Sequence, residues 1–348
     1  MRSHERVRAI YDAVLIVSFG GPEGPEDVIP FLENVLRGKN VPRERLLEVA
    51  EHYRHFNGVS PLNAQNRVLI AALEAVLETQ GPQLPIYWGN RNWHPLLEST
   101  IAQMKRDGIR RAIAFVTSAY SSYSGCRQYR EDIQRAQQAA GADALVVEKL
   151  RAFYNHPGFV GPMGESVATA LDQIPAARRP AAALVYTAHS IPVAMAERSA
   201  YVAQLEEASR LVSQIVGRDD WQLVFQSRSG PPTQAWLEPD IGDYLRDLAA
   251  RGVQDVVVVP IGFLSDHMEV LYDLDTEAQH LSRELGINMI RAATVGAHPQ
   301  FVQMIRDLIV ERMTPGTDRP ALGTRGPSHD VCPADCCLPV RSTAAERG

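Results

Sequence analysis

Short apolar runs alternate with amphipathic segments of helical period along this sequence, and this alternation limits the fold more than any other feature. An apolar, β-branched run such as the four valines at 256–259 is typical of a strand that is buried on both faces of a parallel sheet. Strands that alternate with helices form such sheets, with helices covering both faces. The expected strands lie at residues 13–19, 85–88, 112–117, 144–148, 182–187, 221–225, 255–259 and 287–290.

These strands fall into two groups of four. We therefore predict an α/β protein with two similar Rossmann-like domains, each a parallel sheet of about four strands flanked by helices, with a cleft between them. The first domain is expected to span residues 10–152 and the second residues 153–297, with a last helix at 298–313 packing on the first domain. Residues 314–348, which are rich in Pro and Gly and then in Cys, predict a linker and a Cys-rich tail.

Composition narrows the class of protein. The 348 residues are 45% hydrophobic and carry a net charge of −6, which argues against nucleic acid as the main partner. The first residues lack the apolar core of a secretory signal, and no apolar run reaches the roughly 18–20 residues that span a bilayer. We expect a cytoplasmic protein without a transmembrane segment, while a peripheral membrane contact and the oligomeric state stay open.

A polar and acidic stretch, residues 260–275, follows the expected strand at 255–259. Ligands of open α/β sheets bind beyond the carboxyl ends of the strands, so this position is typical of an active site. If the chain is helical from Met268 onward, Glu269, Asp273 and Glu277 fall on one face at i, i+4 and i+8. Such a row is either a solvated helix face or a path for a divalent cation. The neighbouring Asp266 and His267 favour the functional interpretation.

A histidine, His189, follows the expected strand at 182–187. Alone it could be a structural residue, but with Glu269 from another strand end it makes an imidazole–carboxylate pair. Two such ligands bind a divalent first-row metal weakly and leave positions free, which suits a site that transfers its metal, whereas a structural zinc site uses four ligands. Imidazole also accepts a proton near neutral pH. We predict that His189 and Glu269 form a metal-handling site.

The four cysteines indicate a second site. Cys332, Cys336 and Cys337 lie close together after the Pro/Gly-rich linker, and Cys126 is distant in sequence. In a reducing compartment, cysteines indicate a metal site or free thiols more often than disulfides. Four thiolates suit either a [2Fe–2S] cluster or an all-thiolate zinc site. The remaining alternative is a tail without bound metal.

Five motifs, in order along the chain, resemble the ferrochelatase family, and the resemblance extends from about residue 12 to about residue 312. The motifs are Ser-Phe-Gly-Gly-Pro at 18–22, His-Tyr-x-x-Phe-x-Gly-Val-Ser-Pro-Leu at 52–62, Thr-Ala-His-Ser-Ile-Pro at 187–192, Gln-Ser-Arg-Ser-Gly-Pro-Pro at 226–232 and the stretch 260–275. The resemblance implies a chelatase-like fold and an enzyme that inserts Fe²⁺ into coproporphyrin III or protoporphyrin IX in haem biosynthesis. The alternatives are a non-catalytic porphyrin or haem carrier and a chelatase for another metal such as cobalt or nickel.

The resemblance also implies roles for individual residues. His189 and Glu269 match the catalytic, metal-handling pair, and Asp273 and Glu277 match an acidic path for metal or protons. Phe19 stands where some members have Tyr, and Asn92 stands where some have His or Tyr. The residues that match positions lining the porphyrin are Phe19, Tyr53, Ser60, Arg91 and Tyr129. Some ferrochelatases carry a [2Fe–2S] cluster on one internal and three C-terminal cysteines, which here are Cys126, Cys332, Cys336 and Cys337.

Overall fold

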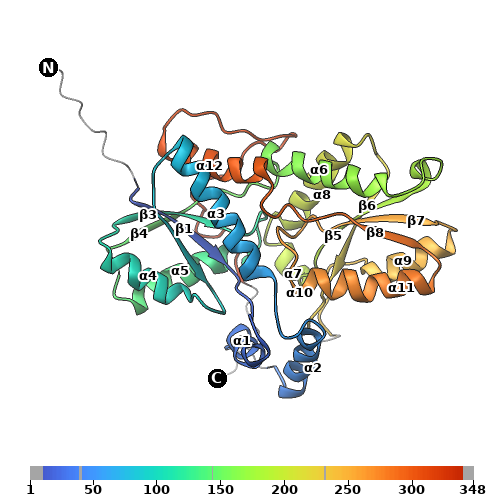
Figure 1. The fold of residues 1–348 in the computed structure, drawn as a ribbon, viewed down its shortest axis with the longest axis horizontal. Helices are drawn as coiled ribbons and strands as arrows, with labels where there is room; N and C mark the ends of the chain where they lie inside the picture. The colour runs from blue at the N-terminus through green and yellow to red at the C-terminus, as the bar shows by residue number, and fades with distance from the viewer. Residues whose placement is uncertain (1–10, 39–40, 143, 231–232, 340–348) are drawn as a thin grey trace.

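Two parallel sheets form the framework of the protein. The computed structural model describes residues 11–38, 41–142, 144–230 and 233–339. The strands are Ala13–Ser18 (β1), Ile86–Asn90 (β2), Arg111–Val116 (β3), Val146–Lys149 (β4), Ala183–His189 (β5), Trp221–Gln226 (β6), Asp255–Val259 (β7) and Asn288–Arg291 (β8). They form one sheet of order β2-β1-β3-β4 and another of order β6-β5-β7-β8, and all neighbouring strands are parallel (Figure 1). The second half repeats the strand order of the first, so the predicted fold class is confirmed.

Helices cover both faces of each sheet, as parallel sheets require. They are Val28–Val35 (α1), Arg43–Arg54 (α2), Leu62–Gln80 (α3), Leu97–Arg106 (α4), Gln128–Ala139 (α5), Pro157–Asp172 (α6), Val193–Ala196 (α7), Tyr201–Ile215 (α8), Ile241–Ala250 (α9), Met268–Leu271 (α10), Gln279–Glu284 (α11) and Pro299–Met313 (α12). Two single π-turns, Tyr123–Arg127 and Asp273–Ala278, precede α5 and α11. None of the helices in the described ranges combines the length and apolar character needed to cross a bilayer.

Alternating residues of β1 pack into two different hydrophobic cores, one on each face of the sheet. In β1, Ala13, Leu15 and Val17 pack with α4 and α5, whereas Val14 and Ile16 face α3 and α12. The cluster that contains Val14 and Ile16 also contains residues of β5, β7, α6 and α8, so the two sheets share one hydrophobic core. This shared core fixes the carboxyl edges of the two sheets relative to each other.

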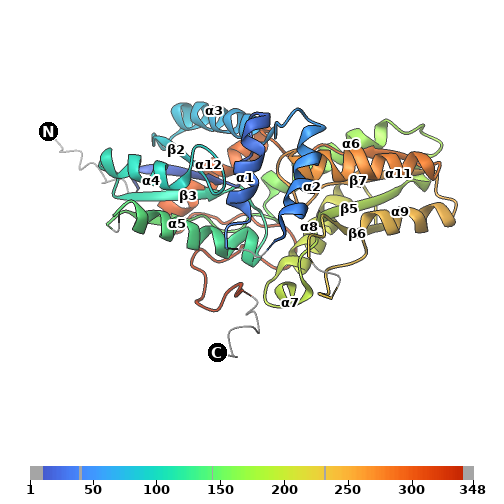
Figure 2. The same ribbon diagram turned by 90° about the horizontal axis from the view of Figure 1, so that it is seen from below.

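The last helix joins the two halves. Helix α12 packs against α3 from the first half and against α6 from the second. Near the opposite end of this junction, α1 and α2 lie side by side (Figures 1 and 2). The boundaries at residues 152 and 297, and the assignment of the last helix to the first domain, stay predictions.

Two elements differ from the sequence-based expectation. Strand β5 extends beyond residue 187 because His189 pairs with Gln226 of β6, so the histidine is the last residue of the strand. The expected single α-helix from Met268 is instead α10, a π-turn and α11 in succession. The backbone N–H of Glu277 reaches the carbonyl oxygen of Tyr272, five residues earlier, at 2.9 Å. The acidic residues therefore do not follow a regular α-helical face.

Candidate active site

His189 and Glu269 meet at the carboxyl edge of the second sheet. Strands β5 and β7 are adjacent and parallel, so the end of β5 and the first turn after β7 lie at the same edge. His189 Nε2 lies 3.4 Å from Glu269 Oε1, and His189 Nδ1 donates to the carbonyl oxygen of Ser190 at 2.5 Å. The two side chains keep 31% and 43% of their surface exposed. The structure thus brings together the two residues predicted to form a pair and leaves part of both accessible to a ligand.

The pair holds a proton tightly. Burial alone would lower the pKa of His189, but the Glu269 carboxylate and the Ser190 carbonyl oppose it and raise the pKa to about 9. Burial likewise would raise the pKa of Glu269, but His189 and then His267 lower it to about 2. An opposite charge favours the ionised form of each partner. At neutral pH the pair is therefore an imidazolium facing a carboxylate.

Neighbouring side chains fix the position of this pair. Gln226 donates through Nε2 to the backbone carbonyl oxygen of Glu269 at 2.5 Å, and its Oε1 accepts a hydrogen bond from Thr187 at 2.8 Å. The Tyr201 hydroxyl donates to the backbone carbonyl oxygen of His189 at 3.0 Å. The sequence analysis assigned no role to Gln226 or Tyr201. Gln226 could have been identified because it belongs to one of the five motifs. Tyr201 lies in no motif, so its sequence context did not indicate a role.

The acidic residues after Glu269 lead outward to solvent. Asp273 accepts a hydrogen bond from the Ser227 hydroxyl, and Glu277 is exposed. Burial, followed by the charges of Glu269 and Glu277, raises the pKa of Asp273 to about 7 against the effect of Ser227. Burial also raises the pKa of Glu277. The row therefore contains a carboxyl group that changes its charge near neutral pH between the half-buried pair and the surface.

An aromatic row lies beside the pair. Phe19 and Tyr53 each make an edge contact with Phe31, with ring centroids 6.2 and 5.9 Å apart. The Glu269 carboxylate is close enough to Tyr53 to raise the pKa of its hydroxyl in addition to the effect of burial. Phe19 is 37% exposed, so part of its ring is accessible to a ligand. These contacts connect two of the predicted porphyrin-binding residues to the His189–Glu269 pair.

The other predicted porphyrin-binding residues extend or support this row. The Arg91 guanidinium lies 4.5 Å from the ring centroid of Tyr129 and 5.8 Å from that of Phe19, and it pairs with Asp132. Tyr129 is buried beneath it. Ser60 is also buried, and its backbone N–H donates to the carbonyl oxygen of Pro22 at 2.8 Å. Tyr129 and Ser60 therefore contribute to the support of the surface more than to the surface itself.

Asn92, Asp266 and His267 hold loops in place. Asn92 donates through Nδ2 to the backbone carbonyl oxygen of Phe19 at 3.2 Å. Asp266 accepts from Arg291 at 3.1 Å, and His267 Nδ1 accepts from the backbone N–H of Glu269 at 3.2 Å, which caps α10. The histidine cap orients the residue that carries the site carboxylate.

The four cysteines, all free thiols, lie together with a histidine. Cys336 Sγ lies 3.6 Å from Cys337 Sγ, and Cys332 is near enough to Cys126 for each thiol to shift the pKa of the other. The donor atoms of His329, Cys332 and Cys336 all lie within 4.8 Å of one another. The Cys332 thiol lowers the pKa of Cys126 to about 5, although burial opposes this shift. Burial and the neighbouring Cys336 raise the pKa of Cys337 to about 12.

The described part of the tail, residues 314–339, contains neither helix nor strand but is held by specific contacts. The Arg127 guanidinium donates to the carbonyl oxygens of Ala334 and Cys336 at 2.8 and 3.0 Å. The Leu322 backbone N–H donates to the carbonyl oxygen of Asn155 at 2.8 Å. The segment expected to be a linker is therefore docked on the body, which explains how the distant Cys126 meets the tail.

Alanine substitution at two glycines of the tail provides a test of this docking. An added Cβ at Gly323 would lie 1.9 Å from Glu207 Oε1, which accepts the backbone N–H of Thr324, while a Cβ at Gly316 would meet no atom within 4 Å. Both glycines have positive φ, so alanine imposes similar backbone strain at each. We expect Gly323→Ala to displace the Glu207 carboxylate, to loosen the tail around Thr324 and to speed tryptic cleavage at Arg325 moderately, with Gly316→Ala close to wild type. Equal cleavage rates for the two variants would contradict the docking.

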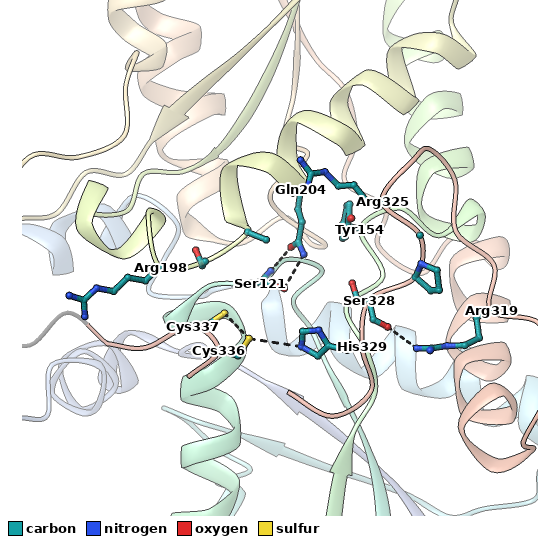
Figure 3. Close-up of a pocket in the computed structure, with 14 residues that line it drawn as sticks. Ser121, Tyr154, Arg198, Gln204, Arg319, Arg325, Ser328, His329, Cys336 and Cys337 are labelled. Atoms are coloured by element: carbon teal, nitrogen blue, oxygen red, sulfur yellow. Dashed lines mark hydrogen bonds between the residues drawn. The ribbon is translucent and has the colours of Figure 1, made fainter. Parts of the chain in front are cut away.

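A pocket of about 780 Å³ opens next to the thiols (Figure 3). Its wall contains Cys336, Cys337 and His329 together with Arg198, Arg319 and Arg325. Gln204 and Ser121, which also line it, bond to each other. The residues that line this pocket include no Asp or Glu among those the structure describes. The wall of the pocket is thus polar and rich in arginine, although Arg319 is already paired with Glu311 and Asp330.

Comparison with known protein families matches residues 11–313 to the family described as ferrochelatase. The chain is 58% identical over 330 residues to a ferrochelatase of Rhodopirellula baltica, covering 94% of this chain and 93% of that one. It is 50% identical over 356 residues to the coproporphyrin III ferrochelatase of Streptomyces griseus, covering 96% and 95%. It is also 51% identical over 356 residues to the coproporphyrin III ferrochelatase of Streptomyces coelicolor, and this match covers 95% of this chain and 94% of that one.

Two solved structures share the fold. One is SirB from Bacillus subtilis with Fe³⁺, with a TM-score of 0.52 and 14% identity, covering 87% of this chain and 96% of that one. The other is the sirohydrochlorin chelatase SirB from Bacillus subtilis subspecies spizizenii in complex with cobalt, with a TM-score of 0.50, 12% identity and the same coverage. At this level of identity, the likeness concerns the fold alone.

Proposed function

This chain belongs to the ferrochelatase family and is an enzyme that inserts iron into a porphyrin in haem synthesis, and we propose that its porphyrin is coproporphyrin III and that His189 and Glu269 carry out the insertion. The observation that carries the residue assignment is the 3.4 Å contact between the partly exposed imidazole and carboxylate. The choice of porphyrin is supported by the two Streptomyces relatives, which are named coproporphyrin III ferrochelatases. Family membership sets aside the non-catalytic carrier, and iron is preferred over cobalt or nickel for the same reason.

Metal insertion requires the porphyrin to lose two pyrrole protons while Fe²⁺ sheds water. His189 is placed to accept a proton through Nε2, because Nδ1 is already bonded to the Ser190 carbonyl oxygen. The resting imidazole carries a proton, since its pKa is about 9. That proton must leave before His189 can act as a base. Glu269 and Asp273 are positioned to take it toward the exposed Glu277, so the same row serves the exit of protons and the entry of the cation.

The aromatic row is proposed to receive the flat macrocycle. Phe19 offers an exposed apolar ring, and Tyr53 continues the row toward Glu269. Arg91, stacked on Tyr129 and paired with Asp132, lies nearly buried beside Phe19, so a propionate carboxylate would have to compete with Asp132 for its guanidinium. Ser60 supports the loop that carries Phe19. A planar apolar ligand with carboxylates at its rim is complementary to this surface.

The substrate proposal is tested by comparing coproporphyrin III and protoporphyrin IX as substrates with Fe²⁺ under anaerobic conditions. We expect kcat/KM to be at least about tenfold higher for coproporphyrin III, which corresponds to ~1.4 kcal/mol in the transition state. The extra propionates would supply this difference through charged hydrogen bonds. Equal or reversed values would overturn the choice of porphyrin without affecting the assignment of His189 and Glu269.

The pH dependence of iron insertion should reflect the ionisation of Asp273. A carboxyl group accepts protons only when it is ionised, and the pKa of Asp273 is about 7. Ionisation of Asp273 should raise kcat/KM for iron insertion as the pH increases through about 7, and loss of the His189 proton should raise it again near pH 9. We expect Asp273→Asn to abolish the first rise and to keep the second. Glu284→Gln, on an exposed side chain of α11, is the control and should keep the wild-type profile. A wild-type profile for Asp273→Asn would exclude Asp273 from the proton path.

We further propose a [2Fe–2S] cluster on Cys126, Cys332, Cys336 and Cys337. Two thiolates on one tetrahedral metal lie about 3.8 Å apart, given a metal–sulfur distance of about 2.3 Å. The 3.6 Å separation of Cys336 Sγ from Cys337 Sγ supplies one such pair, and Cys126 and Cys332, which shift each other's pKa, are the candidates for the second. The donor set therefore fits two irons with two cysteines each. When bound, the cluster would supply one-electron redox chemistry and a covalent link between the tail and the body.

Two further proposals concern the whole chain. We keep the division into residues 10–152 and 153–297, with the last helix and the tail as additional segments. We also propose a cytoplasmic location, because the thiols that would hold the cluster require a reducing compartment for their assembly. Like the division of the chain, the location is supported by the sequence alone.

A further inference from the structure

His329 lies among the thiols although the proposed cluster does not need it. Its Nε2 lies 4.0 Å from Cys336 Sγ, and its donor atom, together with those of Cys332 and Cys336, falls within a span of 4.8 Å (Figure 3). We propose that His329, Cys332 and Cys336 form a site for a single borderline-soft divalent cation such as Zn²⁺, whose occupation excludes the [2Fe–2S] cluster. This inference uses the cysteines of the proposed cluster site but does not depend on the cluster being present.

The geometry is close to that of a tetrahedral metal site. With metal–sulfur distances of about 2.3 Å and metal–nitrogen distances of about 2.0–2.1 Å, neighbouring donors lie about 3.5–3.8 Å apart. The observed separations, 4.0 Å for His329 to Cys336 and at most 4.8 Å for the others, exceed these values by at most about 1.3 Å. Cys337, with its Sγ 3.6 Å from that of Cys336, is close enough to supply a fourth ligand. Small side-chain rotations would complete a Cys₃His set.

Zinc and cluster compete because they need the same thiolates. The cluster uses all four cysteines, whereas the zinc site takes two or three of them together with His329. The histidine therefore distinguishes the two states: it is a ligand of the single cation and a bystander to the cluster. Mixed thiolate–imidazole sets are typical of zinc sites.

The surroundings suit a negatively charged metal–thiolate complex. A divalent cation with three thiolates and a neutral imidazole carries a net negative charge. Arg198, Arg319 and Arg325 line the adjoining pocket, and its described lining contains no carboxylate. Guanidinium groups that line the pocket would offset part of the negative charge of such a complex. The pocket of about 780 Å³ also provides an entry path, because Cys336 and His329 both form part of its wall.

The test uses Co²⁺ as a spectroscopic probe of the cluster-free full chain. Cobalt bound by thiolates has intense sulfur-to-metal charge-transfer absorption, which cobalt at the thiol-free His189–Glu269 pair cannot produce. We expect the wild-type protein to show this absorption and to lose it when Zn²⁺ is added. His329→Ala should lower the affinity of the protein for both Co²⁺ and Zn²⁺ at least about tenfold (~1.4 kcal/mol). His280→Ala, which removes an exposed histidine on α11, is the matched control and should leave both affinities unchanged.

A second measurement separates the two states of the thiols. After cluster reconstitution, His329→Ala should keep the visible absorption and the electron paramagnetic resonance spectrum of the wild-type reduced cluster. Absence of thiolate–cobalt absorption in the wild type, or unchanged cation affinity in His329→Ala, would overturn the proposal. A changed cluster spectrum would also overturn it, since His329 would then be a cluster ligand. Iron insertion is assayed separately, so a failure of the catalytic assignment would leave these spectra unaffected.

Discussion

His189→Ala is expected to reduce the rate of iron insertion by about 10³-fold or more while leaving porphyrin binding nearly unchanged. The imidazole supplies a base on the face of the macrocycle, and general bases contribute about 10²–10⁴-fold to a rate. It also supplies one of the two proposed ligands for incoming Fe²⁺, so its removal affects two steps. The measurement is anaerobic steady-state insertion of Fe²⁺, combined with porphyrin binding measured by quenching of intrinsic fluorescence.

The control for this experiment is a second histidine–glutamate pair on the same molecule. His298 Nε2 lies 3.2 Å from Glu165 Oε2, and the His298 side chain is 31% exposed, as is that of His189. Glu165→Gln should leave insertion unchanged, whereas Glu269→Gln should lower it strongly. Loss of porphyrin binding in parallel with loss of insertion in His189→Ala would instead mark His189 as a structural residue.

Cys126→Ser is expected to abolish the visible absorption of the [2Fe–2S] cluster. The tail contributes only three cysteines, so the fourth ligand must come from the body, and a Ser hydroxyl is a far poorer ligand at neutral pH than a cysteine thiolate. The measurement is the visible spectrum and the iron and sulfide content of protein purified without oxygen. Tyr123→Phe changes the same π-turn without removing a thiol and should retain the cluster.

One experimental result would contradict the proposed cluster. Wild-type protein that is colourless and free of iron after anaerobic purification, and that does not take up a cluster on reconstitution, would falsify it. In that case the four thiols and His329 would be left as a site for a single cation. The assignment of His189 and Glu269 would stand, because the hydrogen bonds that hold this pair come from Ser190, Gln226 and Tyr201, none of which belongs to the tail.

Much of the fold followed from the sequence because the signals are local. Each apolar run of β1, β5 and β7 identifies a buried strand, and the amphipathic segments between the runs identify the covering helices. The strand ends then indicated where His189 and Glu269 lie. The π-turn at Asp273–Ala278 was not predicted, since an inserted residue in a helical turn leaves the apolar period almost unchanged over so short a segment.

The contacts that support the site could not be predicted in the same way. Tyr201 holds the backbone of His189, and Gln226 holds that of Glu269, across separations of 12 and 43 residues. Ser60 and Tyr129 were expected at the ligand surface, yet both are buried beneath it. Whether a polar side chain faces a ligand or supports a loop depends on the packing of neighbouring segments, which a single sequence does not encode locally.

The sequence by itself determined the alternation of strands and helices, the two groups of four strands and the identity of the groups able to bind metal. Local composition and hydrophobic period are sufficient for these, because they act over a few residues. Only the tertiary structure decided that the imidazole and the carboxylate face each other at 3.4 Å, and that residues 314–339 dock so that Cys126 joins the thiols of the tail with His329 beside them. Such distances are set by a hydrophobic core shared between the sheets and by long-range hydrogen bonds, which no short stretch of chain contains.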